Sequence, residues 1–117
     1  MIKLFKKIWN YLFKKKDRNL YSFKFISDNP SKKNLRKNII YIVGNEEYQK
    51  WAYLLCPCGC EEAIMLSLNQ NMNPSWSFDS NTNGVPTIYP SINKLDNCMS
   101  HFWIREGKLI WSNNIIS

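Results

Sequence analysis

Hydrophobic and basic positions recur along residues 1–14 with the period of an α-helix. At about 100° per residue, the hydrophobic side chains fall in one arc of roughly 200° and the polar ones fill the opposite arc. Lys15 and Lys16 fall back into the hydrophobic arc, so the helix is expected to end there. The pattern therefore predicts an N-terminal amphipathic helix of roughly four turns.

After Asp17 the pattern changes to short aromatic or β-branched runs separated by polar segments, which is typical of β-strands. Strands are expected over residues 20–26, 39–43, 51–55, 63–68, 75–78, 101–105 and 108–111. Residues 69–74 and 79–86 are rich in Asn, Gly and Pro and predict loops. The pair Glu106-Gly107 predicts a tight hairpin, because glycine readily adopts the positive φ of a primed turn. The chain is thus expected to be mainly β, with a single small β domain over residues 19–117 and a helical arm over residues 1–18.

Basic residues are concentrated in the arm. The chain has 16 Lys and Arg against 9 Asp and Glu, a formal net charge of +7. Residues 1–18 hold seven of the bases and one of the acids, a net +6, which leaves +1 for the remainder. A nearly neutral domain argues against nucleic acid as a partner. The arm instead predicts docking on its own domain, on a protein partner, or, through residues 1–16, on an anionic membrane surface.

No hydrophobic run approaches the ~20 residues of a transmembrane helix, and the N-terminus lacks the apolar centre and cleavage site of a secretory signal. A cytoplasmic protein is expected, with peripheral membrane attachment if the arm binds lipid. In a reducing compartment, the clustering of the 4 cysteines favours metal binding over disulfides.

Cys56, Cys58 and Cys60 fall on one expected turn, and Cys98 and His101 form a Cys-x-x-His pair before the closing hairpin. Thiolates and an imidazole are typical ligands of a zinc knuckle, so the spacing predicts a structural Zn²⁺. Five candidates compete for four positions. The preferred tetrahedron is Cys56, Cys60, Cys98 and His101, but Cys58 could replace either knuckle member. A closed sphere leaves no position for an activated water, so no catalytic residue is predicted.

The other conspicuous side chains have structural interpretations. Trp51, Trp76, Trp103 and Trp111 lie in or beside expected strands, which predicts packing in the core or around the knuckle. Adjacent glutamates at 46–47 and 61–62 are typical of solvated turns. The basic residues of the 28–38 loop are likewise expected to be solvated.

Four blocks from Cys56 onward resemble the family called domain of unknown function 6527, a group of small bacterial zinc-knuckle proteins. The blocks are Cys56–Cys60 with 66–69, 74–76, 86–92, and 98–105 with Gly107 and Trp111. They cover roughly residues 40–112. The resemblance implies a place beside bacterial ubiquitin-like conjugation genes and a role in antiviral defence. The family pattern has a further cysteine where this chain has Ser112, which leaves the exact ligand set open.

These features together predict a non-enzymatic, zinc-stabilised adaptor of a bacterial ubiquitin-like conjugation system, with a component of that pathway as its protein partner. The alternative is an enzyme, either a zinc hydrolase or a thiol-dependent ligase or peptidase, that acts on the ubiquitin-like modifier. A water on the metal would favour the enzyme, and four protein ligands would favour the adaptor.

Overall fold

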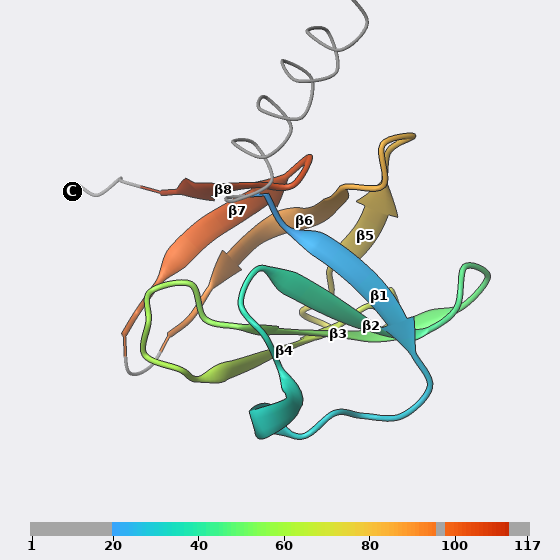
Figure 1. The fold of residues 1–117 in the computed structure, drawn as a ribbon, viewed down its shortest axis with the longest axis horizontal. Coiled ribbons are helices and arrows are strands. Elements are labelled where there is room, and N and C mark those ends of the chain that lie inside the picture. The colour runs from blue at the N-terminus through green and yellow to red at the C-terminus, as the bar shows by residue number, and fades with distance from the viewer. Residues whose placement is uncertain (1–19, 96–97, 113–117) are drawn as a thin grey trace, which may run out of the picture.

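The computed structural model describes residues 20–95 and 98–112. The expected N-terminal helix, and with it the predicted contact through residues 1–16, lies outside this part of the chain. Within the described residues, eight strands form two four-stranded sheets (Figure 1). The protein is therefore mainly β, as the hydrophobic pattern predicts. No helix in the described segments is long and apolar enough to cross a membrane.

The first sheet has the order β1-β2-β3-β4, with strands β1 (Ser22–Ile26), β2 (Ile39–Gly44), β3 (Gln49–Leu55) and β4 (Ala63–Ser67). β1 runs parallel to β2, and the other neighbours are antiparallel. The connection from β1 to β2 contains a 3₁₀ turn, η1 (Lys32–Asn34). It returns the chain to the end of the sheet at which β1 begins, so that β2 can run parallel to β1. The 56–62 loop that joins β3 to β4 is the expected cysteine-bearing turn.

The second sheet has the order β5-β6-β7-β8 and is antiparallel throughout. Its strands are β5 (Ser77–Ser80), β6 (Pro86–Asn93), β7 (His101–Arg105) and β8 (Lys108–Trp111). Glu106 and Gly107 form the predicted tight turn, with φ of 47° and 79°. A side chain at Gly107 would also meet the Val85 side chain at 3.1 Å, so both conformation and space favour glycine there.

Strand β6 is the element that the hydrophobic pattern misses. Its run contains Pro86 and Pro90, and proline inside a strand removes a ladder donor. Pro86 is the first residue of the strand, and Pro90 lies where the register with β7 shifts between Ile88 and Ile92. Both positions tolerate the missing N–H, because a strand end and a bulge interrupt the ladder.

The two sheets share one hydrophobic core. Alternate residues of the strands point inward, as in β3, where Ala52 and Leu54 are fully buried, and in β7, where Phe102 and Ile104 are fully buried. The same alternation turns His101, Trp103 and Arg105 toward the outer face of the second sheet. The core thereby fixes which side chains of β7 are available at the surface.

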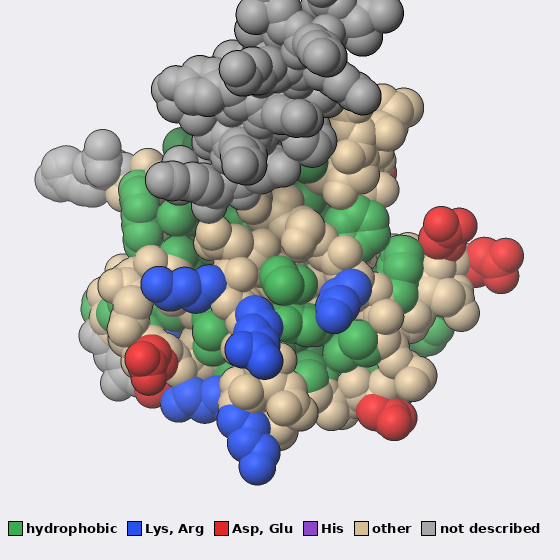
Figure 2. All heavy atoms as spheres, viewed as in Figure 1, with side chains coloured by type: hydrophobic (Ala, Val, Ile, Leu, Met, Phe, Trp, Pro, Cys, Tyr) green, Lys and Arg blue, Asp and Glu red, His purple; other side chains and the backbone are tan. Residues whose placement is uncertain are grey.

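Figure 2 shows the charges on the face over β1 and β2. Hydrophobic and neutral side chains separate most of the basic ones on this face, and acidic side chains stand at its margins. In this view the bases form no continuous patch.

Candidate functional site

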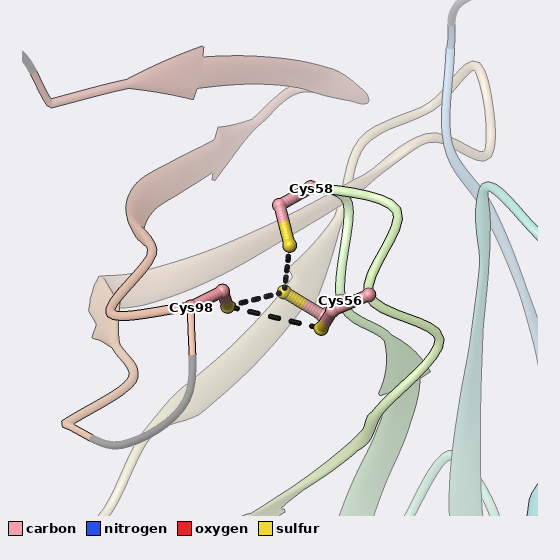
Figure 3. Close-up of side chains that lie close together, drawn as sticks. Cys56, Cys58 and Cys98 are labelled. Atoms are coloured by element: carbon pink, nitrogen blue, oxygen red, sulfur yellow. Dashed lines mark hydrogen bonds between the residues drawn. The ribbon is translucent and has the colours of Figure 1, made fainter.

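The four cysteines meet in one cluster, here called the sulfur cluster (Cys56, Cys58, Cys60 and Cys98). Cys56 directly follows β3. The loop after it curls back, so that the backbone N–H of Cys56 donates to the Glu62 carbonyl at 2.8 Å. Gly59 permits this curl with a φ of 96°. Cys98 arrives from the connection between β6 and β7 (Figure 3). The four Sγ atoms lie within 4.8 Å of one another.

The dimensions of the sulfur cluster fit a tetrahedral metal site. The Sγ of Cys56 lies 3.5 Å from those of Cys58 and Cys98, and the Sγ atoms of Cys60 and Cys98 are 3.8 Å apart. A zinc ion with Zn–S bonds of ~2.3 Å places its sulfur ligands about 3.8 Å apart. The thiols are free cysteines, and a disulfide would require sulfurs at about 2.05 Å. Four soft donors at this spacing are compatible with zinc.

Burial and hydrogen bonding shift the pKa values of two of the thiols in opposite directions. Burial raises the pKa of the Cys56 thiol to about 12. The Ser100 hydroxyl, 3.0 Å from the Sγ of Cys98, lowers the pKa of that thiol to about 6. Ser100 is itself buried and lies 3.6 Å from the Sγ of Cys56. Four thiolates this close to one another need a cation to offset their mutual repulsion, and a divalent metal would supply it.

His101, the expected partner of Cys98 at the metal, lies outside the sulfur cluster. Its Nε2 is 2.9 Å from the Oγ of Ser91 on β6. Cys58, expected to be spare, stands with the other three cysteines instead. The described residues thus bring the four thiols together and leave the imidazole of His101 outside their cluster.

The Ser91–His101 pair is produced by the register of two adjacent strands. Asn93 stands opposite His101, so Ser91, two residues away on β6, projects from the same outer face. Ser91 lies in the part of β6 where the register with β7 shifts, between Ile88 and Ile92. β-Bulges often redirect a side chain next to an active site. Both Ser91 and His101 are half-buried.

Trp76 holds the backbone of Ser91. Its indole N–H donates to the Ser91 carbonyl at 3.1 Å, and its own backbone N–H donates to the Ser67 carbonyl at 2.8 Å. Ser67 ends β4, so Trp76 connects the first sheet to the strand that carries Ser91. This contact is consistent with the packing role expected for Trp76.

A serine hydroxyl at hydrogen-bond distance from an imidazole nitrogen has the geometry of a nucleophile and its general base. The hydrophobic pattern gives no sign of Ser91, which lies in the unpredicted strand β6. One signal was present: the chain has a single histidine, and four cysteines complete a metal site without it. That histidine was therefore available for acid–base chemistry.

The family described as the bacterial ubiquitination-like system serine protease, BubE, matches residues 25–112, which are most of the chain. Comparison with curated proteins and with solved structures yields no match. The match confirms the bacterial ubiquitination-like setting that the resemblance implied, under a different family description from domain of unknown function 6527.

The expectation of a non-enzymatic adaptor is wrong, because the matching family is one of proteases. That expectation assumed that any catalysis would take place at the metal or at a thiol, so a filled metal site seemed to exclude an enzyme. The structure offers a hydroxyl and an imidazole beside the sulfur cluster, and the alternative of an enzyme fits better. Since the match spans residues 25–112, the chain belongs to the BubE family of serine proteases of bacterial ubiquitination-like systems.

Proposed function

We propose that this protein is a serine protease in which Ser91 is the nucleophile and His101 the general base, and that it acts on the ubiquitin-like modifier. The observation that carries the proposal is the 2.9 Å contact between the Ser91 Oγ and the His101 Nε2. A hydroxyl is a weak nucleophile at neutral pH, and a neutral imidazole in this position can accept its proton.

In the first half of the reaction, the Ser91 Oγ attacks the scissile carbonyl while its proton passes to the Nε2 of His101. The resulting imidazolium returns that proton to the departing amine, the amide C–N bond breaks, and an ester to Ser91 remains. In the second half, His101 takes a proton from water, which attacks the ester. The ester C–O bond then breaks, the proton returns to the Oγ, and the products are a carboxylic acid and an amine.

Trp76 has a positioning role in this scheme. The hydrogen bond from its indole to the Ser91 carbonyl restrains the β6 backbone at the register shift, where ladder bonds are fewest. Such restraint matters, because catalysis requires the attacking atom to be held close to its near-attack position.

The proposed substrate follows from the family. The family description names a protease of a ubiquitination-like system. Such a protease would meet the modifier in two chemical forms: as a precursor with residues beyond its functional C-terminus, and as an amide conjugate. Both present the modifier as the acyl group. The ester on Ser91 would therefore carry the tail of the modifier.

We also propose that Cys56, Cys58, Cys60 and Cys98 hold a structural zinc ion. When bound, zinc would neutralise the thiolates and add binding energy to the folding free energy. The 56–62 loop and the connection that carries Cys98 would then be fixed to each other, three residues before His101. The shared spacing of the four Sγ atoms supports this ligand set.

The test of the proposed function is labelling by a fluorophosphonate, which phosphonylates a serine only when a base activates it. Intact-mass and peptide analysis should give one adduct per chain, on Ser91. Ser91→Ala should abolish the label, and the matched control Ser80→Ala, an exposed serine on neighbouring β5, should retain it. A folded Ser91→Ala protein that labels like the wild type would refute the proposal.

A further inference from the structure

The outer face beside Ser91 and His101 carries exposed hydrophobic side chains. Tyr89 precedes Ser91 by two residues on β6, and Trp103 follows His101 by two residues on β7. Their ring centroids are 6.3 Å apart, with an interplanar angle of 43°. Tyr89 and Trp103 therefore form a second side-chain pair across β6 and β7, two residues along each strand from the pair of Ser91 and His101.

These rings are accessible. Tyr89 is 63% exposed, and Ile110 on β8, which stands opposite Trp103, is 40% exposed. Trp103 was expected to pack in the core or around the knuckle, but the buried neighbours Phe102 and Ile104 take the inner face and leave Trp103 partly exposed on the outer one. We call Tyr89, Trp103 and Ile110 the aromatic patch. Hydrophobic surface beside a reactive group commonly marks a substrate site.

A positively charged side chain, Arg105, lies next to Trp103 on the same face of β7. The guanidinium of Arg105 lies 4.6 Å from the centroid of the Trp103 ring. His101, Trp103 and Arg105 occupy alternate positions of one strand, so Trp103 stands about 7 Å and Arg105 about 13 Å from His101 along β7. An extended peptide has the same two-residue period, so its alternate side chains would meet the patch and then the guanidinium.

We infer that the aromatic patch and Arg105 form the subsite that selects the acyl segment of the substrate. This inference rests on the proposed function. Place the residue that carries the scissile carbonyl at Ser91, with the substrate extended along β7. The residue two positions before it toward the N-terminus then places an apolar side chain on Tyr89 and Trp103. The residue four positions before it places a carboxylate beside Arg105. Selection on the acyl side suits a modifier-directed protease, because the modifier tail is constant while the group attached to it varies.

The experiment uses the full chain and acyl-peptide amides of a fluorogenic amine, which contain no residues beyond the scissile bond. One peptide has Leu at the second and Glu at the fourth position back. Its partners change Leu to Ala, or Glu to Lys. The wild type should cleave the Leu peptide about tenfold better than the Ala peptide, as judged by kcat/KM. It should prefer Glu to Lys at the fourth position by about three- to fivefold, as expected for a surface ion pair.

The decisive variant is Arg105→Glu, which should reverse the Glu over Lys preference. The two peptides are compared on one preparation, so the ratio does not depend on the fraction of folded protein. Trp103→Ala should remove most of the Leu over Ala preference. The matched control Lys50→Glu, on β3 of the other sheet, makes the same charge change and should leave both preferences and the labelling of Ser91 unchanged.

The two hypotheses fail separately. If the wild type labels at Ser91 but Arg105→Glu keeps the original Glu preference, the subsite inference is wrong and the proposed function stands. Equal kcat/KM of the wild type for all of these peptides would also overturn the inference. If the wild type labels nowhere and cleaves no peptide, the proposed function itself fails.

Discussion

The sulfur cluster and the Ser91–His101 pair lie three residues apart in sequence, at Cys98 and His101, yet they are built differently. The sulfur cluster comes from turns, and three of its members fall within five consecutive residues. The Ser91–His101 pair comes from neighbouring strands whose register fixes which side chains meet. In the sulfur cluster Cys56 is buried while Cys58 and Cys60 are exposed, whereas Ser91 and His101 are both half-buried. Under the proposed function this difference is a division of labour, in which the thiols would stabilise the fold and the hydroxyl and imidazole would carry out the chemistry.

The largest expected effect is on folding. Cys56 is the buried member of the sulfur cluster, and Cys56→Ser should leave the protein insoluble or lower its melting temperature by more than about 10 °C, because metal-binding energy is also folding energy. Thermal unfolding together with elemental analysis measures this.

Cys58→Ser is the matched control, since Cys58 is an exposed member of the sulfur cluster, on the same turn as Cys60, which is also exposed. It should retain more zinc and more stability than Cys56→Ser. Equal zinc content and equal melting temperatures in the two variants and the wild type would show that the cysteines hold no metal.

The next effect separates the two sites. His101→Ala should lower kcat/KM by at least about a thousandfold, as loss of the base does in serine proteases. Zinc content should stay at about one per chain, because four thiolates complete the sphere. If His101→Ala instead loses its zinc, the imidazole belongs to the metal and the division of labour is wrong.

Much of the fold follows from alternation and turn chemistry. Buried side chains alternate with more exposed ones in the runs that became β3 and β7, β2 is buried at four successive positions, and Glu106-Gly107 specifies its own hairpin. β6 could not be predicted, because Pro86 and Pro90 interrupt its pattern, and the bulge that accommodates Pro90 exists only once β7 is in place.

For the candidate site too, features set by local sequence spacing could be predicted and those set by pairing across strands could not. Local spacing of thiols points to a metal, and all four cysteines do cluster, although the preferred ligand set had His101 in place of Cys58. The Cys-x-x-His spacing also drew His101 into the ligand set, whereas strand alternation turns its side chain outward to Ser91. A pair formed across two strands leaves no spacing signal in the sequence. This is why Ser91 was missed and an adaptor was expected.

An intermediate effect should appear at Ser100, whose hydroxyl lies 3.0 Å from the Sγ of Cys98. Ser100→Ala removes a buried donor to the thiolate, which should destabilise the protein by about 1–3 kcal/mol and weaken zinc retention against a chelator. Denaturant unfolding and a chelator titration measure the two effects. Unchanged zinc retention would show that the hydroxyl does not support the ligand.

The smallest expected effect is at Trp76. Trp76→Phe keeps an aromatic ring but removes the indole N–H that bonds the Ser91 carbonyl. We expect kcat to fall about three- to tenfold, with KM nearly constant and a stability loss of about 1 kcal/mol. Steady-state kinetics with denaturant unfolding distinguish this from a purely structural role, in which stability would fall and kcat per folded molecule would not.

The central claim is that His101 serves Ser91 while four thiolates hold the metal. X-ray absorption at the zinc edge of the purified full chain tests it most directly. The account predicts four sulfur ligands at about 2.3 Å and no nitrogen ligand. Three sulfurs with one nitrogen at about 2.0–2.1 Å would place His101 on the metal and contradict the account.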